Sequence, residues 1–203
     1  MIGIIFATRF EARPFLSLTR ASQVCDQPFK LYITQEPPGL PIMISGIGKV
    51  AAAVACHELI REHAIDYLLN AGACGALHDS SELEIGRLVR IASAVEGDHT
   101  PFEKQLAPLS SAGRVAAELP AAALVTSDKP VFDPQARACF GRLGDVVDME
   151  GAAIARTAAL SDIPWDMIKG VSDPADTIDH DLLRRNIVGV SEKIAQVLFD
   201  AIQ

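Results

Sequence analysis

Three acidic residues occur where a carboxyl group could take part in catalysis. Glu11 follows an apolar run at the N-terminus, Glu150 stands between a short apolar run and an alanine-rich stretch, and Asp173 ends a further apolar run. A carboxylate such as Glu150 at a helix start is favoured in its ionised form and can accept two hydrogen bonds from a sugar diol. A partly buried aspartic acid such as Asp173 can keep a proton near neutral pH and act as a general acid. Each residue taken alone also has a purely structural explanation. Glu150 could be a carboxylate at a helix start that binds no ligand, and Asp173 could form an Asx turn at the start of a loop.

Two glycine-containing segments are candidates for close contact with a ligand. Residues 70–75 read Asn-Ala-Gly-Ala-Cys-Gly and include Gly72, and glycine lets a ligand approach the backbone closely. An ordinary turn explains this segment equally well. Residues 45–49 read Ser-Gly-Ile-Gly-Lys and lack the spacing of a nucleotide-binding phosphate loop, which favours a tight turn between a strand and a helix. The amides at that helix start remain available to an anion.

The hydrophobic pattern predicts the elements that must position these residues. Strands are expected over residues 2–7, 29–34, 40–45, 65–71, 88–94, 122–126, 146–147 and 165–170, and helices over 11–18, 49–63, 151–160 and 182–202. Pro14 is expected in the first turn of the first helix, and residues 97–120 are expected to form a loop with a short helix. Alternating strands and helices predict one α/β domain over residues 1–203, with helices on both faces of the sheet. Ligands of such sheets gather where strands end, which is where the candidate segments lie.

Composition and charge exclude several classes of protein. Of the 203 residues, 49% are hydrophobic and 22% are charged, which excludes an intrinsically disordered chain. The balance of 18 basic and 26 acidic residues gives a formal charge of −8, which argues against a nucleic-acid-binding surface. No apolar run has the length of a membrane span, and the N-terminal run lacks the features of a signal peptide.

The cysteines and histidines predict neither disulfides nor a metal site. The four cysteines are widely spaced without a CxxC pair, and the five histidines lack the spacing of metal ligands. We therefore expect reduced thiols, no metal or other cofactor, and a cytoplasmic protein without membrane or nucleic-acid partners.

Taken in order, several segments resemble the nucleoside phosphorylase and nucleosidase superfamily, and most of all its branch of 5′-methylthioadenosine/S-adenosylhomocysteine nucleosidases. The resemblance covers nearly the whole chain. The matching segments are Gly3-Ile4-Ile5 with Glu11, Ser45-Gly46-Ile47-Gly48-Lys49, Asn70-Ala71-Gly72-Ala73-Cys74-Gly75, Gly86-Arg87-Leu88-Val89, Asp148-Met149-Glu150-Gly151-Ala152-Ala153 and Val171-Ser172-Asp173-Pro174-Ala175-Asp176. The resemblance implies a three-layer α/β sandwich around a mixed, partly barrel-like sheet, usually in a homodimer or larger homo-oligomer.

The resemblance also implies a reaction, the hydrolysis of the N-glycosidic bond of a purine-type nucleoside. Asp173 would protonate or hydrogen-bond the base at N7, and Ser172 would help to hold its carboxyl group. Glu150 would bind the ribose hydroxyls, Met149 would pack against the sugar, and Glu11 would orient and deprotonate the attacking water. The other residues of the implied substrate pocket are Asp148, Gly72, Ala73, Val131 and Phe132.

Departures from the family pattern keep other activities open. Phosphorylases of the superfamily commonly have an arginine where this chain has Asn70, so that Asn70 together with Glu11 favours hydrolysis. Arg9 and Arg13, however, flank Glu11 and offer cations for a phosphate co-substrate. Phosphorolysis, and cleavage of a futalosine-type or lipid-linked nucleoside, are therefore alternatives. A non-catalytic nucleoside-binding protein is a third, against which the presence of all three carboxylates argues.

Overall fold

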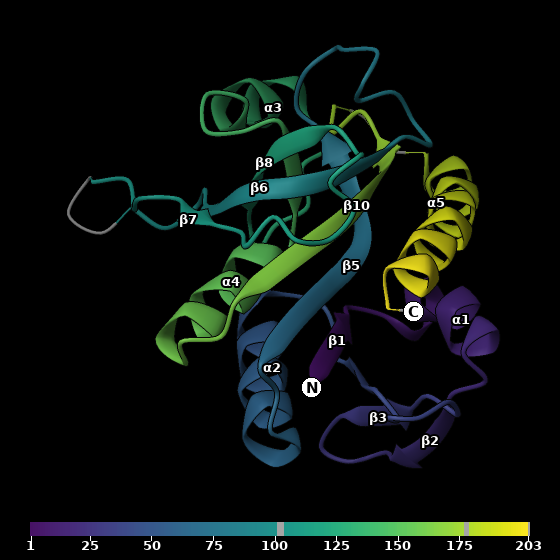
Figure 1. Cartoon of the computed structure of the whole chain (residues 1–203). Helices are drawn as coiled ribbons and strands as arrows, with labels where there is room; N and C mark the ends of the chain where they lie inside the picture. Colours follow the sequence, from purple (N-terminus) through teal and green to yellow (C-terminus); the bar gives the residue numbers. More distant parts are fainter. Residues whose placement is uncertain (101–103, 177–178, 203) are drawn as a thin grey trace.

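The computed structural model describes residues 1–100, 104–176 and 179–202, and a ten-stranded mixed sheet forms its centre (Figure 1). The strand order is β10-β6-β8-β9-β5-β1-β4-β3-β2, with β7 paired to β6. Because β10 also pairs in parallel with β5, the strands β5, β9, β8, β6 and β10 close into a small barrel, from which β1 to β4 extend. The strands are β1 (Ile2–Phe6), β2 (Ser22–Cys25), β3 (Lys30–Ile33), β4 (Pro41–Ile44), β5 (Tyr67–Ala76), β6 (Leu88–Glu96), β7 (Leu109–Ser110), β8 (Ala121–Thr126), β9 (Val146–Asp148) and β10 (Trp165–Asp173).

Helices cover both faces of this sheet. The helices are α1 (Arg9–Leu18), α2 (Lys49–His63), α3 (Pro134–Phe140), α4 (Gly151–Leu160) and α5 (His180–Ala201). The pair α2 and α4 packs on one face and the pair α1 and α5 on the other, as Figure 1 shows. One buried cluster, with Leu59 and Ile154, lies under the first pair, and a second, with Phe15 and Leu198, lies under the other. This arrangement confirms the predicted α/β class with helices on both faces.

Two strands continue three residues or more beyond their predicted ends. β5 continues through residues 70–75, where Gly75 pairs with Val147 of β9, and β10 continues to Asp173. A Cβ atom at Gly75 would lie 2.9 Å from the Asp173 carboxylate, so the small residues of this segment serve close strand pairing. The predicted strand end at residue 71 is therefore wrong, and so is the alternative of an ordinary turn over residues 70–75.

The first helix begins at Arg9, two residues earlier than predicted, so Pro14 lies in its interior instead of its first turn. A capping box sets this start, because the Thr8 hydroxyl accepts the Glu11 amide while the Glu11 carboxylate accepts the Thr8 amide. The elements β2 and α3 were not predicted. Residues 101–103 lie outside the described residues, and the rest of 97–120 contains β7 but no helix.

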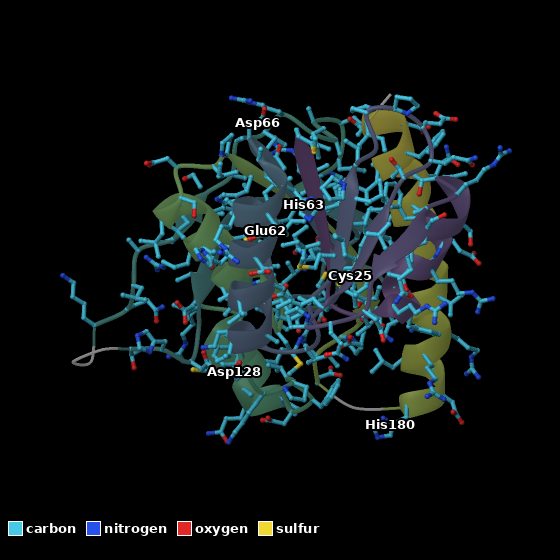
Figure 2. The ribbon with its side chains drawn as sticks, turned by 90° about the horizontal axis from the view of Figure 1, so that it is seen from below. Cys25, Glu62, His63, Asp66, Asp128 and His180 are labelled. Atoms are coloured by element: carbon cyan, nitrogen blue, oxygen red, sulfur yellow. The ribbon has the colours of Figure 1, made fainter. Side chains whose placement is uncertain are left out.

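The described helices include none with the length and apolar character of a membrane span. Cys56 and Cys74 are buried, Cys25 and Cys139 are exposed, and all four are free thiols. His63 and His180 belong to different helices and are well separated in Figure 2. Among the described residues, no three His, Cys, Asp or Glu side chains are placed together to hold a metal ion.

Candidate active site

A cavity of about 740 Å³ opens where β1, β9 and β10 end, beside residues 73–75 of β5. The loop after β8 and one side of α5 complete its wall. Of the ten residues that the family resemblance places at the site, all except Gly72 belong to the lining. The lining residues are Ala7, Thr8, Phe10, Glu11, Ile47, Ala73, Cys74, Gly75, Lys129, Pro130, Val131, Phe132, Val147, Asp148, Met149, Glu150, Ser172, Asp173, Leu183, Arg184 and Ile187.

Glu11 is held at both carboxylate oxygens. The amide and hydroxyl of Thr8 donate to Oε2 at 3.1 and 2.7 Å, and the Ala73 amide donates to Oε1 at 2.9 Å. Gly72 lies behind this carboxylate, because a Cβ atom at Gly72 would come within 2.8 Å of Oε1. Gly72 thus makes room for Glu11 and does not itself line the cavity. A carboxylate fixed in this way is suited to orient a water molecule and take its proton.

The Asp173 carboxyl group lies in the cavity lining at the end of β10 and is half-buried. Ser172 Oγ donates to Oδ2 at 2.7 Å, and the Ala175 amide donates to Oδ1 at 2.9 Å. Burial raises the pKa of Asp173 above its ordinary value, although these two hydrogen bonds oppose the rise. Asn186 of α5 fixes Ser172 in turn by donating to its carbonyl oxygen at 2.8 Å. A carboxyl group with a raised pKa that faces a cavity is suited to donate a proton.

Glu150 is the N-cap residue of α4, not a member of its first turn, and is only 7% exposed. The Gly48 amide donates to its Oε1 at 2.8 Å. Burial, and then repulsion from Asp148, raise the pKa of Glu150 from 4.5 to about 7. The expectation that the helix start keeps Glu150 readily ionised is therefore wrong, since burial outweighs the helix dipole.

A buried ion pair lies beside Glu150. Lys169 Nζ is 2.7 Å from Asp148 Oδ2, and both side chains are 2% exposed. Thr126 Oγ1 donates to the other oxygen of Asp148 at 2.6 Å, so protein groups already occupy this carboxylate. Burial by itself lowers the pKa of Lys169, but the carboxylates of Asp148, Glu150 and Glu11 outweigh burial and raise it. Lys169 therefore supplies a positive charge to a cluster of three carboxylates.

The sequence reasoning missed Lys169. Its signal was a lysine inside the mostly apolar run 165–170, which also contains Asp166, because a lysine buried in a strand needs a carboxylate partner. Nothing in the local sequence names that partner, which comes from β9.

Arg9 and Arg13 lie on the opposite side of α1 from Glu11, two residues away from it in each direction. With Arg20 and Tyr32 they line a separate groove of about 780 Å³. Neither arginine belongs to the lining of the cavity that contains Glu11. The suggestion that they offer cations beside Glu11 is therefore wrong.

Comparison with known proteins gives this site a family. All of residues 1–203 match the model of the phosphorylase superfamily. The 5′-methylthioadenosine/S-adenosylhomocysteine nucleosidase of Shewanella denitrificans is 32% identical over 206 residues, which cover 86% of each chain. That of Shewanella loihica is 27% identical over 201 residues, with the same coverage of 86%.

Solved structures agree with the sequence match. The 5′-methylthioadenosine/S-adenosylhomocysteine nucleosidase of Neisseria meningitidis, in complex with methylthio-immucillin-A, has a TM-score of 0.88 at 25% identity, covering 99% of this chain and 97% of that one. The futalosine hydrolase of Helicobacter pylori has a TM-score of 0.89 at 20% identity, covering 99% and 96%, and shares the fold. The chain therefore belongs to the phosphorylase superfamily and, within it, to the family of 5′-methylthioadenosine/S-adenosylhomocysteine nucleosidases.

Proposed function

We propose that this chain hydrolyses the N-glycosidic bond of a purine-type nucleoside, as the names of its relatives suggest. The observation that carries the proposal is the placement of three carboxyl groups with different environments around one cavity. The pKa of Asp173 and that of Glu150 are raised, while Glu11 accepts hydrogen bonds at both oxygens. Glycosidic cleavage needs one carboxylic acid for the leaving group and carboxylates for the sugar and the water, so such a separation is required.

In the proposed mechanism, Asp173 donates its proton to N7 of the base while the bond between the base and C1′ breaks. The electron pair of that bond stays with the base, and positive charge develops on the ribose. Ionised Glu150 accepts hydrogen bonds from the ribose hydroxyls and stabilises this charge, with Met149 packed against the sugar. Water held by Glu11 then attacks C1′ and passes a proton to Glu11.

Four apolar side chains of the lining support a nucleoside with an apolar 5′ group. Phe10, Ile47, Leu183 and Ile187 line the cavity, and Phe10 and Ile47 are 44% and 62% exposed. Such a surface favours an uncharged substituent, which 5′-methylthioadenosine carries. A futalosine-type nucleoside is the second candidate, on the strength of the shared fold with a futalosine hydrolase. With either nucleoside, Val131 and Phe132 would contact the base, and Ala73 would lie beside the attacking water.

The test is incubation of the purified protein with methylthioadenosine, S-adenosylhomocysteine, futalosine and inosine, each with and without inorganic phosphate. Chromatography of the products should show free base and free sugar without phosphate. A strict phosphate requirement with a sugar phosphate as product would contradict hydrolysis. Tight binding in calorimetry without release of base from any of the four would contradict the enzymatic proposal and favour a binding protein.

We further propose that two chains pair through α2. Val50 and Val54, one turn apart on α2, are 76% and 53% exposed, and Ile47, just before α2, is 62% exposed. With Phe29 and Met149 they line an open groove of about 710 Å³ that adjoins the cavity. Contiguous exposed apolar residues are typical of a protein interface. Light scattering should give twice the mass of one chain, and Val50→Glu should give the mass of a single chain.

The proposed reaction needs no metal or organic cofactor, and phosphate enters only if the protein is a phosphorylase. Activity should therefore survive dialysis against a chelator unchanged. The four free thiols support the proposal that the protein works in the reducing cytoplasm.

A further inference from the structure

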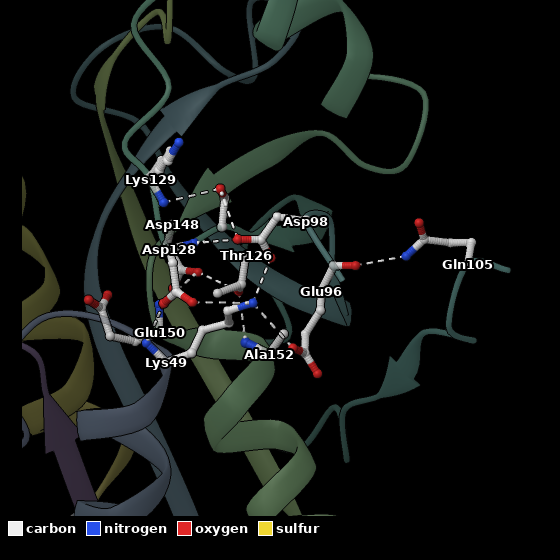
Figure 3. Close-up of polar contacts among 11 residues, drawn as sticks. Lys49, Glu96, Asp98, Gln105, Thr126, Asp128, Lys129, Asp148, Glu150 and Ala152 are labelled. Atoms are coloured by element: carbon white, nitrogen blue, oxygen red, sulfur yellow. Dashed lines mark hydrogen bonds and ion pairs between the residues drawn. The ribbon is translucent and has the colours of Figure 1, made fainter. Parts of the chain in front are cut away.

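Three carboxylates surround Lys49, the first residue of α2, as Figure 3 shows. Lys49 Nζ lies 2.6 Å from Asp98, 3.3 Å from Glu96 and 3.6 Å from Asp128, and its side chain is 14% exposed. Burial alone would lower the pKa of Lys49, but the three carboxylates raise it above its ordinary value. The ammonium group is thus charged at neutral pH and joins the end of β6 to the loop after β8.

The same acidic residues hold the backbone at the start of α2. Asp128 Oδ1 accepts the Lys49 amide at 3.0 Å, and Asp98 Oδ2 accepts the Asp128 amide at 2.8 Å. The N-cap residue of α2 is Gly48, with a φ of 97° and no side chain to cap the helix. The turn into α2 is therefore fixed from outside, through Lys49 and its partners.

Gly48 connects this network to the cavity. Its amide donates to Glu150 Oε1 at 2.8 Å, although the two residues are 102 positions apart in the chain. The loop that holds Asp128 continues into Lys129 and Val131, which line the cavity. Lys49 is not itself a lining residue. Its ion pairs thus stabilise both a hydrogen-bond donor to Glu150 and the wall of the cavity nearest the expected base.

We propose that Lys49 is a positioning residue that holds the Gly48 amide against Glu150 and so keeps Glu150 ionised for catalysis. This inference rests on the proposed function of Glu150. Because Lys49 does not line the cavity, it acts on the reaction through the residues that it holds, and Gly48 is the one that contacts Glu150 directly.

Charged groups from several elements act on the ionisation of Glu150 together with the Gly48 amide. Asp148 from β9 and Glu11 from α1 disfavour the ionised form of Glu150, whereas Lys169 from β10 favours it. Asp173, also from β10, lines the same cavity. The Gly48 amide and Lys169 therefore oppose burial and two carboxylates. Without the Gly48 amide, Lys169 is the remaining group that favours the ionised form of Glu150, and Lys169 is already paired with Asp148.

The test is the pH dependence of kcat/KM for Lys49→Met with methylthioadenosine, expressed relative to the wild type. If the pKa of Glu150 rises by about one pH unit from about 7, its ionised fraction at pH 7 falls from about one half to about one eleventh. We therefore expect a loss of about five-fold at pH 7 and of less than about two-fold at pH 9. Ionisation of Asp173 at high pH lowers both activities alike and cancels in the ratio.

Two further variants separate this role from general destabilisation. Lys193→Met is the matched control, because Lys193 also has a hydrogen-bonded ammonium group but contacts Gly86, in a loop that does not line the cavity. Its relative activity should stay near one at every pH. Asp98→Asn weakens the same network from the other side, and it replaces Lys49→Met if that variant does not fold. Hydrogen exchange of the Gly48 amide should be faster in both network variants and unchanged in Lys193→Met.

A loss that is equal at all pH values, or a Gly48 amide that exchanges at the wild-type rate, would overturn the proposal. If the wild-type protein releases no base from any nucleoside, the proposed function fails separately. The exchange rate of the Gly48 amide then decides alone whether Lys49 anchors this turn.

Discussion

Replacing Glu150 by glutamine should make the folded protein more stable while removing its activity. Glu150 is buried, and burial with repulsion from Asp148 raises its pKa from 4.5 to about 7. Between these pH values the folded protein keeps a proton on Glu150 that the unfolded chain releases. Folding stability therefore falls as the pH rises through this window. Glutamine has the same shape and no charge, so the variant avoids this loss and still accepts the Gly48 amide.

The size of the effect follows from the pKa values. A rise of about 2.5 pH units at about 1.4 kcal/mol per unit corresponds to about 3.5 kcal/mol above pH 7. A neutral amide accepts the Gly48 hydrogen bond less strongly than a carboxylate, which leaves an expected gain of about 2–3 kcal/mol at pH 8. With an m value of about 2–3 kcal/mol/M, the urea midpoint should rise by about 1 M. Near pH 4.5 both proteins are neutral at this position and should unfold at nearly the same urea concentration.

Urea unfolding at pH 4.5, 6, 7 and 8 tests this prediction. Trp165 is the single tryptophan and is 4% exposed, so its fluorescence reports the loss of the core. Asp26→Asn, at an exposed position outside the cavity lining, controls for the loss of one negative charge. Equal midpoints of wild type and Glu150→Gln at pH 8, or a difference that grows toward low pH, would refute the reasoning.

Three other substitutions test the remaining parts of the site. Asp173→Asn should lower kcat by about 10²–10⁴-fold without unfolding the protein. Because the pKa of Asp173 is raised, the activity of the wild type should fall as the pH rises through that pKa. Gly72→Ala places a Cβ atom 2.8 Å from the Glu11 carboxylate, and kinetic assays should show kcat lower by about 10–100-fold with KM little changed. Lys169→Met leaves Asp148 buried without its cation and should lower the free energy of unfolding in urea by about 3–5 kcal/mol. Adding Asp148→Asn to Lys169→Met should restore part of the lost stability. Purely additive losses of the two substitutions would contradict the ion pair.

The elements that position the carboxylates were predictable, because their patterns are local. Apolar runs mark β1 and β10, and the alanine-rich periodicity marks α2, so the ends of strands could be placed near one another. β2 was missed because all four of its residues are exposed and show no alternation of apolar and polar side chains. α3 was missed because it spans only seven residues and buries none of them.

The contacts that set the chemistry of the site were not predictable, because they join distant segments. Glu150 receives its hydrogen bond from Gly48, and Asp148 receives its cation from Lys169. Sequence reasoning placed Glu150 at a helix start and so predicted an easily ionised carboxylate. Only the packed structure reveals how deeply Glu150 is buried, and burial reverses that prediction.

The charges around the cavity also bear on which nucleophile the site accepts. Behind the lining, Lys169 is already paired with Asp148, and Glu11 lines the cavity itself. A phosphate dianion placed beside Glu11 would meet repulsion from that carboxylate without a free cation from Lys169 to offset it. Lys129 and Arg184 line the cavity only at exposed positions, where water screens their charge. Water carries no charge and can donate a hydrogen bond to Glu11, so the electrostatics of the cavity favour hydrolysis over phosphorolysis.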